Sequence, residues 1–152
     1  MQTGRRFRVA LLVVLLVLAA AQLSAQTSVG VILGEPTGLS AKMWLGGNAS
    51  VDLAVAWSFL GEGTIYVHGD YQYHFPYSEV TIGQLFFFAG VGPKFYIGDQ
   101  ILIGLRIPLG AVYHFADLPL EAFIELAPGM QLFPATRIDG GGGIGIRYQL
   151  DM

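Results

Sequence analysis

Hydrophobic and polar residues alternate along residues 84–115, in the segment QLFFFAGVGPKFYIGDQILIGLRIPLGAVYHF. The alternation has a period of two residues, which is the period of a β-strand. Gly98-Asp99 divides the segment and predicts a tight turn, so the two arms should form a β-hairpin. One face of each arm is apolar throughout, whereas the other mixes glycine, aromatic and charged residues. This contrast is typical of a barrel wall with lipid outside and a polar lumen inside.

The same alternation recurs in six further segments, residues 27–34, 39–45, 49–60, 64–75, 118–133 and 138–152. Together with the hairpin they make about eight strands, and eight is the smallest common size of an outer-membrane barrel. We therefore predict an all-β fold, a single up-and-down antiparallel transmembrane β-barrel. Residues 76–83 are expected to form its longest connection.

The charged residues sort by face in these segments. Those within the predicted strands fall on the non-lipid face, as a membrane barrel requires, because an Arg or Lys facing lipid near the midplane costs ~2–4 kcal/mol. An eight-stranded barrel is filled by its own side chains, so opposite charges should pair inside it. The predicted lumen ion-pair network consists of Lys42, Asp52, Asp70, Lys94, Arg106, Glu121, Glu125 and Arg147, with Asp151 on the same face. The remaining charges are expected in or beside turns: Glu35, Glu62, Glu79, Asp99, Asp117, Arg137 and Asp139.

Three prolines fall at one height on neighbouring strands when positions are counted from the turns. They are Pro93, Pro108 and Pro128, and the glycine run 140–143 falls near the same height on the next strand. Proline removes a hydrogen-bond donor from the ladder and glycine favours bulges. A belt of weakened pairing is therefore expected there.

The N-terminal segment has the three parts of a secretory signal. Arg5, Arg6 and Arg8 precede an apolar run, and Ala25 ends a stretch of small residues before Gln26. The apolar run is too short to cross a bilayer comfortably, although an uncleaved anchor helix is the alternative. We expect residues 1–25 to be a signal peptide cleaved after Ala25, and residues 26–152 to form the barrel.

Composition narrows the possible functions. The 152 residues are 53% hydrophobic and 12% charged, with a formal net charge of −3. The acidic balance does not suggest nucleic-acid binding. The chain has no cysteine, which excludes disulfides, thiolate metal sites and a thiol nucleophile. No histidine spacing suits a metal, and no phosphate-binding loop is present, so no cofactor is expected.

One set of polar residues could carry acyl-transfer chemistry. His68 and Asp70 share a face of one predicted strand, and Ser50 or Ser58 could lie on its neighbour. Serine, histidine and an acid together can form a nucleophilic site. The spacing is not specific, however, and the nucleophile-elbow motif is absent. We expect these side chains to be polar residues of the lumen or its rim.

The segments VGVILGEPTGLSAKMWL, VDLAVAWSF, IGLRIPLGAVYHF, LEAFIELAPGMQLFPAT and GGIGIRYQL resemble a family of small exported bacterial barrels of uncharacterised function. That family includes a spirochaetal member that has been compared with the OmpA transmembrane domain. The LGEPTG turn is the most specific part of the resemblance, which covers nearly all of residues 26–152. The resemblance implies an eight-stranded outer-membrane barrel and no catalytic residues. Met152 stands where the outer-membrane assembly signal usually ends in Phe or Trp.

These observations predict a non-enzymatic barrel of the bacterial outer membrane with a structural or surface-interaction role. Its expected partners are outer-membrane lipid and the outer-membrane assembly machinery. The connections expected to face outside are short, GEPTG, GEG, GD and PATR, which disfavours a large adhesive surface. Two alternatives remain, a lipid acyl hydrolase or transferase and a soluble periplasmic lipocalin-like binder of an apolar ligand. The latter would need its apolar face inside the barrel.

Overall fold

The chain folds into a closed antiparallel β-barrel in a computed structural model, which describes residues 26–35, 37–57, 64–80 and 82–151. The expected signal peptide, the GEG turn, Ser58 and Met152 lie outside the described residues. The strands are β1 (Gln26–Glu35), β2 (Gly38–Gly46), β3 (Ala49–Trp57), β4 (Ile65–Val80), β5 (Gly83–Ile97), β6 (Ile101–Arg106), β7 (Leu109–Phe115), β8 (Leu120–Phe133) and β9 (Arg137–Asp151).

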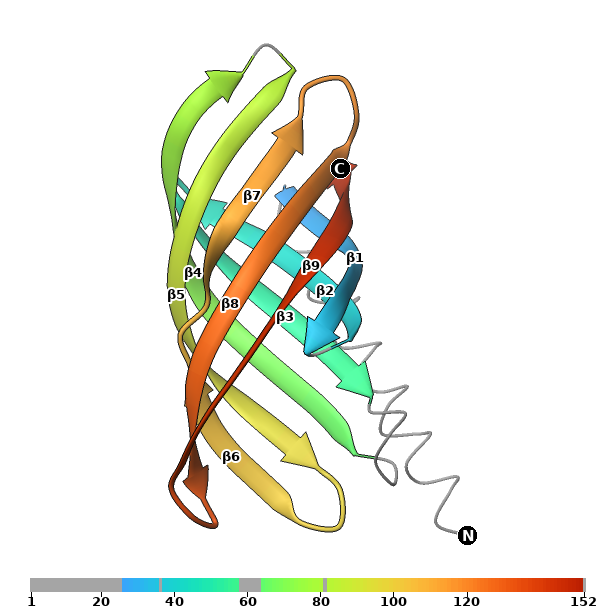
Figure 1. The fold of residues 1–152 in the computed structure, drawn as a ribbon. Coiled ribbons are helices and arrows are strands. Elements are labelled where there is room, and N and C mark those ends of the chain that lie inside the picture. Colours follow the sequence, from blue (N-terminus) through green and yellow to red (C-terminus); the bar gives the residue numbers. More distant parts are fainter. Residues whose placement is uncertain (1–25, 36, 58–63, 81, 152) are drawn as a thin grey trace, which may run out of the picture.

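The strands β6 and β7 are two halves of one predicted strand. Both pair with β5 on one side and with β8 on the other, so eight strands surround the lumen. Each other strand pairs with its neighbours in sequence, and β1 pairs with β9 from Gln26↔Asp151 to Glu35↔Gly142. This last pairing closes the ring, visible where the blue and red strands meet in Figure 1. The predicted up-and-down barrel is confirmed.

The expected belt of weakened pairing is narrower than predicted. Ile107 and Pro108 interrupt the ladder between β6 and β7, because proline cannot donate to it. Ile107 N–H instead donates to the carbonyl of Pro128 at 2.9 Å. Pro93 pairs with Leu105 on β6, but the register between β4 and β5 passes from Lys94 to Val91 and leaves Pro93 unpaired on that side. Pro128 likewise pairs with Gly140 on β9 but has no ladder partner on β6 or β7. The weakened pairing therefore occurs at the three prolines, whereas the glycine run pairs with β8 without interruption.

Residues 76–83 do not form the longest connection, and that prediction was wrong. β4 continues through Pro76 to Val80, and β5 begins at Gly83. A register shift between Pro76 and Ser78 accommodates the proline, since a bulge leaves one residue unpaired. Of the charges expected in or beside turns, Glu35 ends β1, Glu79 lies next to the end of β4 and Arg137 begins β9, whereas Asp139 lies inside β9.

Side chains of opposite character face the two sides of the wall. Large apolar residues are exposed on the outside, for example Leu33 at 57%, Ile124 at 57% and Leu126 at 69%. Inside, a small apolar cluster packs among the charged side chains and is formed by Ile32, Phe88, Val112 and Phe123. The apolar face is therefore outside, opposite to what a lipocalin-like barrel needs. No helix in the described part of the chain is long and apolar enough to cross a bilayer.

Candidate functional site: the charged lumen

All eight residues of the predicted network lie inside the barrel, and each is at most 4% exposed. They come from seven of the strands, so the network links most of the wall. Unpaired charges at such depth would cost several kcal/mol each, so their partners decide whether the arrangement is stable. The structure gathers most of them around two arginines, Arg106 and Arg147.

Arg106, on β6, organises the first cluster. Its guanidinium forms ion pairs with Glu125 and with Asp70, the latter at 3.2 Å from Nε to Oδ2. The third guanidinium nitrogen, Nη1, donates to His68 Nδ1 at 2.6 Å and to the Tyr66 hydroxyl at 3.2 Å. The cluster thus joins β4, β6 and β8 through one side chain, and the planar guanidinium suits such multiple contacts.

His68 and Asp70, the candidate acyl-transfer pair, belong to this cluster. His68 Nε2 lies 3.5 Å from Asp70 Oδ2, so the two do adjoin. However, Arg106 contacts both, and their side chains are 1% and 0% exposed. An acyl chain has no direct access to this histidine, because the surrounding lumen side chains enclose it.

Ser50 lies near a different histidine. Its hydroxyl is 3.3 Å from His74 Nε2, and Lys42 Nζ is also 3.3 Å from that nitrogen. Both Ser50 and His74 are fully buried. The structure therefore brings a serine to a histidine, but not to the His68–Asp70 pair. Groups of three His, Cys, Asp or Glu residues that could hold a metal ion are absent from the described residues.

Arg147, on β9, organises the second cluster. It contacts Glu121 at 2.9 Å and Asp52 at 2.5 Å through its two terminal nitrogens, and Nε donates to Ser40 Oγ at 2.9 Å. The guanidinium carbon lies 3.8 Å from the centre of the Phe123 ring. This side chain therefore spans the lumen from β9 to β8, β3 and β2.

The two lysines have partners that the sequence did not indicate. Lys94 pairs with Asp139, which was expected beside a turn but lies in β9 with its side chain 28% exposed. Lys42 donates to His74 and lies 5.2 Å from the centre of the Phe88 ring. The sequence could have indicated that Asp139 faces the lumen. It lies an even number of positions from Arg147 on one strand, and such residues share a face.

Comparisons with known proteins support the fold. No protein-family model and no curated protein sequence matches the chain. Among solved structures, the chain is similar to the N-terminal β-barrel domain of Pseudomonas aeruginosa OprF, with a TM-score of 0.64 and 15% identity over 84% of this chain and 98% of that one. It is also similar to the outer-membrane enzyme PagL, with a TM-score of 0.54 and 15% identity over 84% of this chain and 100% of that one.

These similarities show that the chain has the fold of small outer-membrane barrels. At 15% identity they show the fold alone. The resemblance of the LGEPTG segment to a particular family of exported barrels therefore stays a prediction.

Proposed function

We propose that this protein is a small integral barrel of the bacterial outer membrane, exported with a signal peptide, that has a structural or surface-interaction role without catalysis. The main support for this proposal is the contrast between the two sides of the barrel wall. The outer side exposes apolar residues, whereas the lumen encloses paired charges. A membrane solvates the first arrangement, and a closed barrel satisfies its own backbone without water.

Aromatic residues on the outside support the membrane location. Tyr73, Phe75 and Tyr77 are 46%, 51% and 68% exposed along the half of β4 that runs toward the 81–82 connection. Tyr73 packs edge-on against Phe75 at a centroid distance of 5.1 Å. Aromatic residues, tyrosine in particular, concentrate at the level of the lipid headgroups in membrane barrels. The expected contacts are therefore with outer-membrane lipid and, during insertion, with the assembly machinery.

The short connections support a modest external surface. Two of the connections lie at the end of the barrel opposite Gln26 and Asp151. There β5 joins β6 through residues 98–100, and β8 joins β9 through residues 134–136. Neither is long enough to fold into an extended binding platform. Any extracellular partner would therefore meet the rim of the barrel itself.

Catalysis on lipid is the second candidate, because a structurally similar protein is an outer-membrane enzyme. The test is incubation of detergent-solubilised protein with phospholipid and with lipid A, comparing wild type with His68→Ala and with Ser50→Ala. We expect no released fatty acid above a heat-denatured blank in any sample. Release that either substitution abolishes, in a protein that still folds, would contradict the proposal.

A further inference from the structure

A pocket of about 330 Å³ lies inside the end of the barrel where β1 begins and β9 ends. Residues from several strands line it, including Trp44 on β2, Phe86 on β5 and His114 on β7. The pocket opens at the rim, where Gln84 is exposed. It is separate from the catalytic candidates, since neither His68 nor Ser50 lines it. Its volume falls at the lower end of the range for small-molecule sites.

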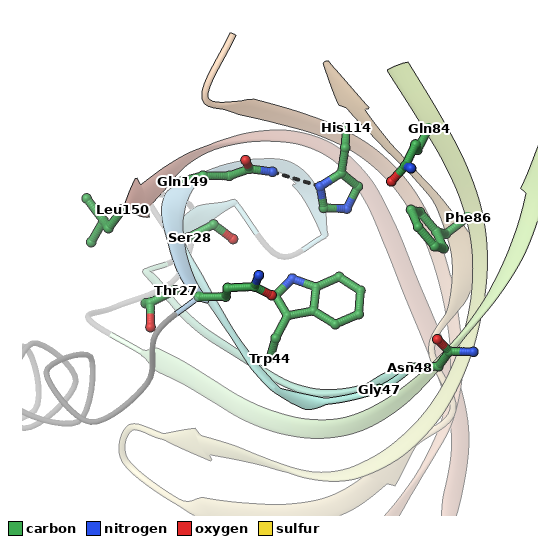
Figure 2. Close-up of a pocket in the computed structure, with 11 residues that line it drawn as sticks. Thr27, Ser28, Trp44, Gly47, Asn48, Gln84, Phe86, His114, Gln149 and Leu150 are labelled. Carbon is green, nitrogen blue, oxygen red and sulfur yellow. Dashed lines mark hydrogen bonds between the residues drawn. The ribbon is translucent and has the colours of Figure 1, made fainter. Parts of the chain in front are cut away.

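Three rings converge on this pocket from different strands (Figure 2). The centroid of the Trp44 ring lies 5.9 Å from that of His114 and 6.3 Å from that of Phe86. The Phe86 and His114 centroids are 5.5 Å apart. An indole beside two further rings offers flat, electron-rich surface to the apolar C–H face of a ligand.

Side-chain amides supply the polar part of the lining, from Asn48, Gln84 and Gln149 among others. Each amide can donate and accept hydrogen bonds at once, which matches neighbouring hydroxyl groups on a ligand. Lys, Arg, Asp and Glu are absent from the described residues that line the pocket. A charged ligand would find no Lys, Arg, Asp or Glu among these residues, and an apolar chain would offer no hydrogen bonds to the amides.

The pocket is also held in place by the lumen network beneath it. The Gln149 amide donates to His114 Nδ1 at 2.7 Å, and His114 Nε2 lies 3.7 Å from Glu121 Oε2. Glu121 in turn accepts from Ser28, another lining residue, at 3.0 Å. Trp44 packs edge-on against His74 at a centroid distance of 4.4 Å. Rings fixed before binding lose little conformational entropy when a ligand arrives.

We propose that this pocket binds a neutral saccharide of one or two rings. One face of a sugar ring carries C–H groups that stack on Trp44, and its hydroxyls both donate to and accept from the amides. A sugar thus satisfies both kinds of lining, and its size suits the volume. The site goes beyond the proposed structural role and does not depend on where the barrel resides.

The test is titration of the full-length protein, purified in a zwitterionic detergent because maltoside detergents would compete. Maltose and N,N′-diacetylchitobiose are added in the millimolar range while NMR follows the indole and amide side-chain signals. We expect saturable shifts of the Trp44, Asn48 and Gln149 signals with at least one of the two sugars. The substitutions Trp44→Leu and Gln84→Ala should each weaken binding by about tenfold.

Gln84→Ala keeps the test decisive if Trp44→Leu fails to fold, because the Gln84 side chain is exposed at the rim. Tyr71→Phe serves as the control, since Tyr71 is 52% exposed and does not line the pocket, so its substitution should leave binding unchanged. Absence of shifts with both sugars would overturn the proposal. Equal binding by wild type and Gln84→Ala, or shifts only with a short aromatic peptide added as a third probe, would overturn it as well.

Discussion

Arg106 is the residue on which one half of the lumen depends. Its guanidinium contacts Asp70 and Glu125, and both carboxylates are almost fully buried. Replacing it by Leu would leave them without a cation, so Arg106→Leu should lower the free energy of unfolding by ~3–5 kcal/mol. The measurement is equilibrium urea unfolding in lipid vesicles, followed by tryptophan fluorescence.

The control for this prediction is Arg137→Leu, which removes the same charge from an exposed position on β9. Its effect should stay within ~0.5 kcal/mol, as for most surface substitutions. Equal effects of the two substitutions would mean that the Arg106 ion pairs contribute no specific stability.

Leu126 tests the outer face in the same way. It lies near the middle of β8, is 69% exposed and points away from the lumen. If lipid surrounds it, Leu126→Arg should cost ~2–4 kcal/mol. The same substitution at Leu118, in the connection between β7 and β8, should cost far less because that position lies at the end of the wall. Vesicle unfolding of both variants checks this, and a harmless Leu126→Arg would contradict a lipid-facing wall.

At the scale of the strands, replacing each of two glycines by alanine should have different effects on stability. A Cβ on Gly92 of β5 would lie 2.0 Å from the carbonyl oxygen of Gly69 on β4, whereas a Cβ on Gly140 of β9 would meet nothing closer than 3.6 Å. Gly92→Ala should therefore force β4 and β5 apart and cost ~1–3 kcal/mol, as overpacking does. Gly140→Ala should leave the unfolding midpoint nearly unchanged. Similar midpoints for both variants would show that this close strand contact is absent.

The strands were largely predictable from the sequence, because a period of two fixes which side chains share a face. The sequence therefore placed Arg106, Glu125 and Arg147 inside before any contact was known. It did not indicate which charges pair, since partner choice depends on the register between strands. Lys94 thus meets Asp139, whose place before a glycine run resembled a turn. Pro76 was likewise predicted to begin a connection, but a bulge lets β4 continue past it.

The whole barrel combines a closed ring with a filled lumen. Ion pairs around Arg106 and Arg147 and the cluster containing Phe88 and Phe123 occupy its centre. A lumen filled in this way should not pass ions continuously. We expect purified protein in planar lipid bilayers to give no sustained conductance above the protein-free baseline. A steady open channel would contradict the plugged lumen.

The central claim is that residues 26–151 form a closed barrel with its apolar side in a membrane. The most direct test is a gel of the outer-membrane fraction on which unboiled and boiled samples run side by side. Closed membrane barrels resist detergent until heated, because every strand is hydrogen-bonded on both sides. The account predicts a membrane-embedded band whose mobility changes on boiling. A soluble protein whose mobility is the same before and after boiling would contradict it.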